Sequence, residues 1–189
     1  MFSLFKQSLK TEDIAEVCWK SILKNRQWYI DEVIGNSGDR IKRLVNEPDE
    51  FVYYLFFIDD WSFNSQIKNE DILKSFRNHF YRYIWKYADE NKCNSIVWGK
   101  WLIEHCCWQP PDSSYDNKTP KENLNKRLEL YNEAIQRRVK EKEPHGYVCS
   151  RLCLALSGNI DFADRLDLMV YFLERWKFHK EVIKKFKIK

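Results

Sequence analysis

Apolar residues recur at helical spacing along most of the chain, and this pattern predicts a series of α-helices. The sequence TED at 11–13 indicates the start of the first helix, because a hydroxyl N-cap followed by acidic side chains suits the positive end of a helix dipole. The apolar pattern that follows can continue as far as the GNSG turn at 35–38. Its predicted apolar face is Ile14, Ala15, Cys18, Trp19, Ile22 and Leu23.

The run FVYYLFFI at 51–58 is apolar on every side and fits either a buried strand or a buried helix. Pro48 precedes it at a position typical of a first helical turn, where the missing proline N–H costs nothing. We predict a helix, because the sequence offers no second strand to pair with this segment.

Two further helices are predicted, one from its apolar stripe and one from its start signal. The helix expected at 69–90 places its core residues within a sector of about 120° at 100° per residue. The sequence TPKE at 119–122 combines a capping box with proline in the first turn, so a helix is predicted to follow it. The core stripe of the first is Ile72, Phe76, Phe80, Tyr83, Ile84 and Tyr87, and that of the second is Leu124, Leu128, Tyr131, Ile135 and Val139.

The remaining pattern predicts helices at 39–46, 95–107, 147–157 and 161–186, a mobile loop at 109–118 and a frayed basic tail at 184–189. The last helix is aromatic and apolar almost all round, which is typical of a central, buried helix. We therefore expect residues 1–189 to form a single all-α domain, a bundle of seven or eight helices around an aromatic-rich C-terminal helix.

Composition agrees with a folded helical protein. Of the 189 residues, 44% are hydrophobic and 32% charged, which is outside the range typical of disorder. The chain contains only 5 Gly and 5 Pro, too few for the many turns of an all-β fold. The N-terminal sequence does not look like a secretory signal, and the longest apolar run falls far short of the roughly 20 residues that span a bilayer. We expect a cytoplasmic protein, without membrane association, whose 6 cysteines are reduced.

One segment resembles part of a calcium-binding motif. The sequence GNIDFAD at 158–164 is similar to the second half of an EF-hand loop, but Cys153 and Ala155 stand where the first oxygen ligands should be. Calcium requires six to eight oxygen ligands, so this half-loop is interpreted as a helix stop followed by a capped helix.

No other motif predicts a metal or a catalytic site. His145, Cys149 and Cys153 could supply three ligands, but the C-x2-C pairs typical of zinc sites do not occur, and buried thiols are the simpler interpretation. The acidic pair Asp59-Asp60 and the acids Asp161, Asp164 and Asp167 are interpreted as solvated faces and caps. We expect no metal and no cofactor, and favour a non-enzymatic protein, although an enzyme whose site residues meet only in the fold stays open.

One helix face is a candidate binding surface. Tyr81 and Trp85 lie about 120–150° from the core stripe of the 69–90 helix at 100° per residue, on one face with Lys74, Asn78 and Arg82. Such a face can anchor a protein interface, where Trp, Tyr and Arg dominate the binding energy. It can also stack nucleic-acid bases, or be covered by another helix.

We expect a module that binds another protein. Its small size and the absence of catalytic motifs suggest an inhibitor, antitoxin or immunity-type protein that neutralises its partner. The alternative is a protein that binds RNA or single-stranded nucleic acid through the same face and the C-terminal run WKFHKEVIKKFKIK, which has six lysines against one glutamate. Salt separates the two, because counterion release makes polyanion binding fall steeply with ionic strength. The oligomeric state is left open.

Overall fold

The computed structural model describes residues 8–28, 31, 48–93, 119–141, 173–175, 177–184 and 187–188. The helices are α1 (Thr11–Trp28), α2 (Pro48–Gln66), α3 (Glu70–Glu90) and α5 (Pro120–Glu141), with a further helical segment at 173–175 and 177–184, and the strands are β1 (Ser8–Leu9) and β2 (Lys187–Ile188). The all-α prediction is confirmed over these ranges. They contain five helical segments, so the predicted count of seven or eight is not supported.

Several predicted features lie outside the described residues. They are the helices at 39–46, 95–107 and 147–157, the loop at 109–118, the calcium-like segment at 158–164, and the group of His145, Cys149 and Cys153.

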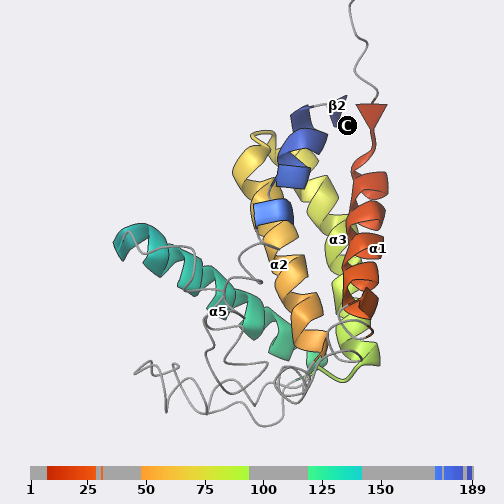
Figure 1. Ribbon diagram of the computed structural model, residues 1–189, viewed down its shortest axis with the longest axis vertical. Helices are drawn as coiled ribbons and strands as arrows, with labels where there is room; N and C mark the ends of the chain where they lie inside the picture. Colours follow the sequence, from red (N-terminus) through yellow and green to blue (C-terminus); the bar gives the residue numbers. More distant parts are fainter. Residues whose placement is uncertain are drawn as a thin grey trace, which may run out of the picture.

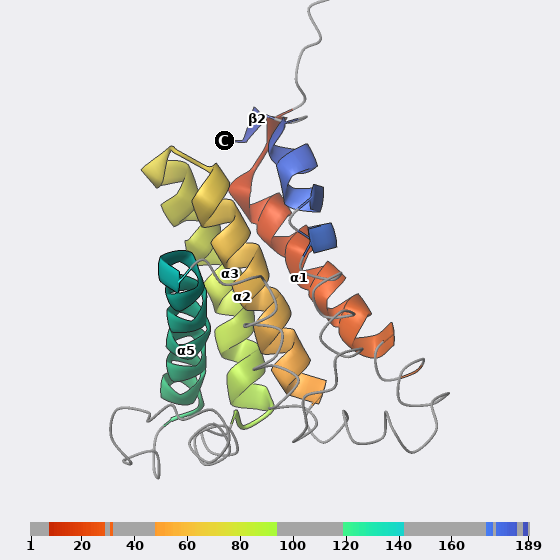
Figure 2. The same cartoon turned by 60° about the vertical axis from the view of Figure 1, so that its left-hand side comes forward.

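Helix α2 is buried on all sides over residues 51–60. It packs against α1, α3 and α5, and these three helices surround it in Figures 1 and 2. Every residue from Phe51 to Ile58 is at most 6% exposed, which confirms the helix that we predicted over the alternative strand. An apolar run without a polar face is stable as a helix when neighbouring helices cover its whole circumference.

The prediction of a central C-terminal helix is wrong for the turns that the structure describes. These turns lie beside α1 and α2 at one end of the bundle (Figure 2) and leave Leu173 and Phe178 37% and 49% exposed. Their buried side chains are the polar Arg175 and His179. The aromatic residues of this helix therefore do not all point inward, because two inward positions are taken by polar groups.

Helix α1 begins as predicted, but Thr11 is not its N-cap. The carbonyl of Lys10 accepts the N–H of Ile14 at 3.2 Å, so Lys10 occupies the cap position and Thr11 is the first helical residue. The Thr11 hydroxyl instead lies 2.7 Å from that of Ser75 on α3. Five of the six predicted core residues of α1 are buried, and Leu23 is 36% exposed.

Helices α2 and α3 form an antiparallel hairpin joined by residues 67–69. Asn69 caps α3 by accepting the N–H of Ile72 at 3.0 Å. The predicted stripe is confirmed at Phe76, Phe80 and Ile84, which are all buried. These rings and side chains pack toward α2, where Phe56 and Phe80 stack at 4.4 Å between centroids.

Helix α5 begins with the predicted capping box. The Thr119 hydroxyl accepts the N–H of Glu122 at 3.3 Å, and the Glu122 carboxylate accepts the N–H of Thr119 at 2.8 Å. Leu124 and Tyr131 are buried against the core. The helix packs on α2 and α3 and leans away from the bundle toward its C-terminal end (Figure 1).

The two ends of the described chain meet in a short parallel pair, with Ser8 opposite Lys187 and Leu9 opposite Ile188. Residues 187 and 188 belong to the stretch expected to fray at 184–189. They are paired in the structure because Leu9 and Ile188 both pack against the core cluster. None of the described helices is long and apolar enough to cross a membrane.

Candidate functional site

The predicted surface on α3 lines a shallow depression of about 620 Å³, which we call the α3 hollow. Its lining residues are Arg77, Asn78, Tyr81, Arg82 and Trp85. Lys74 does not line it, although it is exposed one turn before Asn78 on the same helix face. The structure thus brings together four of the five residues that the sequence singles out, and adds Arg77.

Tyr81 and Trp85 are anchored aromatic rings. They contact each other edge to face with 5.6 Å between centroids, and Tyr81 also contacts the buried Phe56 at 5.0 Å. The ammonium of Lys121 on α5 lies 3.8 Å from the centroid of the Trp85 ring, a cation–π contact. Both rings are half-buried, so α5 covers only part of the α3 face that carries them.

Positive charge dominates the surface around these rings. Lys74, Arg82 and Lys121 are exposed, and none of them forms an ion pair with a residue that the structure describes. The α3 sequence from 72 to 88 contains four Lys or Arg residues and no acidic residue. The α3 hollow is therefore suited to a ligand or partner that carries negative charge.

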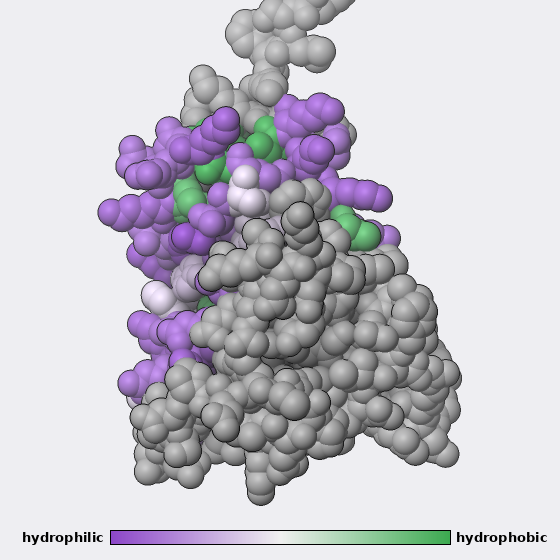
Figure 3. Space-filling model, turned by 90° about the vertical axis from the view of Figure 1, so that its left-hand side faces the viewer, coloured by the Kyte–Doolittle hydropathy of each residue, from purple (hydrophilic) through white to green (hydrophobic). Residues whose placement is uncertain are grey.

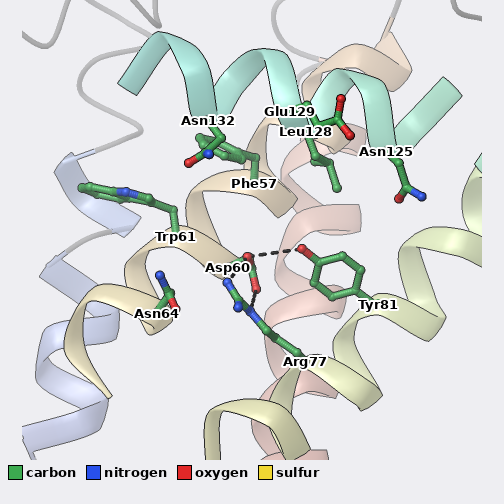
Figure 4. A pocket seen from close by; sticks show the side chains of 10 residues that line it. All are labelled: Phe57, Asp60, Trp61, Asn64, Arg77, Tyr81, Asn125, Leu128, Glu129 and Asn132. Atoms are coloured by element: carbon green, nitrogen blue, oxygen red, sulfur yellow. Dashed lines mark hydrogen bonds and ion pairs between the residues drawn. The ribbon is translucent and has the colours of Figure 1, made fainter. Parts of the chain in front are cut away.

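A second depression of about 490 Å³ adjoins the α3 hollow, and we call it the three-helix groove (Figure 4). Helix α2 contributes positions 57, 60, 61 and 64, and α5 contributes 125, 128, 129 and 132. Both sets have the i, i+3, i+4, i+7 spacing of a single helix face. Arg77 and Tyr81 of α3 line both depressions, so the two adjoin at these side chains.

Asp60 organises the boundary between the two depressions. Arg77 donates to it through Nε and Nη2 at 2.7 and 2.8 Å, and the Tyr81 hydroxyl donates at 3.3 Å (Figure 4). The prediction that this aspartate belongs to a solvated face is wrong, because it is only 8% exposed. Burial, and then the charge of Asp60, raise the pKa of Tyr81, which keeps its hydroxyl protonated as a donor.

Three asparagines line the three-helix groove with side-chain amides that bond no residue in the described ranges. Asn64, Asn125 and Asn132 are exposed, and their amides bond no described residue. Asparagine is a poor helix former within a helix and is favoured where its side chain caps or turns the backbone. The sequence analysis missed these residues. Asparagines within a predicted helix, away from its cap positions, could have indicated them.

A buried polar cluster lies at the other side of α2. Asp59 is fully buried, and Arg175 donates to both of its carboxylate oxygens, through Nε at 2.6 Å and through Nη2. His179 Nε2 lies 3.3 Å from Asp59 Oδ1 and 3.9 Å from the Cys18 sulfur. The prediction that Asp59 is solvated is also wrong. Arg175 and His179, one turn apart in an aromatic helix, were the only sequence signal of this cluster.

Electrostatics make this cluster a structural one. Burial lowers the pKa of His179 despite the opposing charge of Asp59, so the ring is neutral near pH 7. Burial, reinforced by Asp59, raises the pKa of Cys18, which keeps the thiol protonated. A nucleophilic cysteine reacts as an accessible thiolate, whereas Cys18 is 2% exposed and its thiol is protonated.

The same cluster is also the one group of possible metal ligands among the described residues. The ligand atoms of Cys18, Asp59 and His179 all lie within 4.8 Å of one another. A divalent ion there would stand beside the guanidinium of Arg175, which already engages both carboxylate oxygens. The charge of Asp59 is balanced by arginine, so we assign the cluster to holding the C-terminal helix against α1 and α2.

Comparisons with protein-family models, with curated proteins and with solved structures found no match to this chain.

Proposed function

We propose that this protein is a non-enzymatic module that binds another protein through the α3 hollow, as an inhibitor, antitoxin or immunity-type protein does. One observation carries the proposal: exposed cations that pair with no carboxylate of the described residues flank two anchored aromatic rings. Trp, Tyr and Arg supply most of the binding energy at protein interfaces, and rings held in place lose little entropy on binding. The partner accordingly presents acidic side chains to Arg82, Lys74 and Lys121.

A protein partner fits the surroundings better than a nucleic acid does. A nucleic-acid backbone that continued from the α3 hollow into the three-helix groove would meet the exposed carboxylate of Glu129, which repels phosphate. The net charge of the whole chain is only +4. Proteins that track a phosphate backbone carry extended basic grooves, whereas this surface alternates cations, amides and carboxylates.

A neutralising role requires a surface and no chemistry. Among the described residues, Cys18 and His179 form the one contact between a cysteine and a histidine. Both side chains are buried, and the Cys18 thiol is protonated. Steric blocking of a partner requires only affinity. This is why an inhibitor or immunity-type protein is favoured over an enzyme.

The test is differential capture by two charge-reversal variants of the full chain. Arg82→Glu reverses a charge in the α3 hollow, and Lys24→Glu makes the same change at an exposed position of α1. Each immobilised variant and the wild type are incubated with nuclease-treated lysate of the source cells, and the bound proteins are quantified. We expect one protein to be retained by wild type and Lys24→Glu and lost from Arg82→Glu.

Two outcomes would count against the proposal. Equal retention of every bound protein by both variants would show that the α3 hollow is not the interface. Capture that disappears with nuclease, or bound RNA that dissociates steeply with salt, would favour the nucleic-acid alternative.

A further inference from the structure

We propose that the three-helix groove holds an extended peptide segment of the partner, bound through its backbone by the side-chain amides of Asn64, Asn125 and Asn132. This inference rests on the proposed function and names what the partner places beside the α3 hollow. Figure 4 shows amides from α2 and α5 around the rim of the groove, with Arg77 and Tyr81 reaching toward it from α3.

The three amides are available for this task. Each one is exposed and bonds no residue within the described ranges. A side-chain amide carries both donors and an acceptor, so it can pair at the same time with the N–H and the C=O of one residue of an extended chain, which point to the same side. A set of such amides around one groove is therefore matched to a polypeptide backbone.

The spacing of the amides fits an extended chain. Asn125 and Asn132 are seven residues apart, which is about 10.5 Å along a helix axis at 1.5 Å per residue. An extended segment in the polyproline II conformation covers about the same length in three residues, at about 3.1 Å per residue, and its three-residue repeat turns residues i and i+3 to the same side. The two amides can thus engage peptide groups of one continuous segment.

An extended segment suits the groove better than a helix does. The backbone groups of a docked helix are already bonded within that helix, so they would leave the three amides unpaired. The groove also offers apolar walls at Phe57 and Leu128 for side chains of the segment. Because Arg77 and Tyr81 line both depressions, an acidic residue of the same segment can reach Arg82 in the α3 hollow.

The test uses random 12-residue peptides displayed on phage and selected on the immobilised full chain. The best peptide is then synthesised, and its affinity is measured by fluorescence anisotropy. The double variant Asn125→Leu/Asn132→Leu removes two amides with little change in shape. Gln27→Leu is the control, because it removes from α1 an exposed amide that donates to Asp31, away from the groove. We expect at least a tenfold loss of affinity in the double variant and less than a twofold change in the control.

Backbone methylation identifies the contacts directly. Each peptide N–H is replaced in turn by N–CH3, and we expect two sensitive positions about three residues apart whose sensitivity disappears in the double variant. Peptides that bind the double variant as tightly as the wild type, or a library that yields no peptide, would overturn the inference. If Arg82→Glu releases the captured protein partner while the double variant retains it, the groove inference fails and the proposed function stands.

Discussion

Asp59 and Asp60 are neighbours in the sequence and form ion pairs on different sides of α2. Asp59 binds Arg175 of the C-terminal helix, and Asp60 binds Arg77 of α3. Successive residues of a helix point about 100° apart, so two adjacent carboxylates can serve two different neighbours. One holds the C-terminal helix in place, and the other shapes the boundary between the α3 hollow and the three-helix groove.

The two aspartates should differ in their contribution to stability. Asp59→Asn leaves the buried guanidinium of Arg175 without a counter-charge and should lower the free energy of unfolding by about 3–5 kcal/mol. Asp60→Asn should cost about 1–2 kcal/mol, because the Arg77 side chain is 37% exposed and water compensates its charge. Urea denaturation of the two variants measures the difference. Equal losses would contradict the assignment of Asp59 to a buried structural pair.

Acid should destabilise the fold through His179. Burial lowers its pKa below the ordinary value of 6.5, so the unfolded chain binds a proton more readily than the folded one. Stability from this group is complete above about pH 6.5 and is lost as the pH falls from there through the lowered pKa. Denaturation melts between pH 7.5 and 5 should show this slope, with a shallower one in His179→Asn. The same slope in both proteins would assign the effect to other groups.

The groove asparagines should reduce stability. Asn125→Ala and Asn132→Ala each replace a poor helix former by the best one at an exposed position, so each should raise the free energy of unfolding by up to about 0.7 kcal/mol. The same substitutions should weaken partner binding. A loss of stability in either variant would show that the amide has a structural role in α5.

Trp85→Ala should act on both stability and binding. Removing a completely buried aromatic side chain lowers the free energy of unfolding by about 3–5 kcal/mol. Because Trp85 is half-buried, its removal should lower the free energy of unfolding by roughly half as much. The folded variant should bind the partner more weakly by roughly 2 kcal/mol, as interface hot spots do. A variant that is folded and retains wild-type affinity would remove Trp85 from the binding surface.

Local signals in the sequence predicted the helices well. The cap at Thr119 and the core stripes of α1 and α3 depend on residues within one or two turns of each other, so local sequence is sufficient to predict them. The face carrying Tyr81, Arg82 and Trp85 followed from the same helical angles, and the structure places these residues in one hollow.

Contacts between distant segments were not predictable in this way. Asp59 and Arg175 are separated by 116 positions, and nothing near Asp59 distinguishes a buried aspartate from a solvated one. The three-helix groove likewise forms only where faces of α2, α3 and α5 meet. The sequence could show each asparagine as a poor helix former, but it could not show that the three line one groove. Thr11 was misassigned as a cap because its true partner, Ser75, lies on another helix.

The most direct test of partner binding through the α3 hollow is the affinity of the captured partner, purified, for Arg82→Glu and Lys24→Glu by isothermal titration calorimetry. We predict that Arg82→Glu weakens binding at least about 30-fold, or about 2 kcal/mol, and that Lys24→Glu changes it by less than about twofold. Equal affinities of the two variants for the partner would contradict this account.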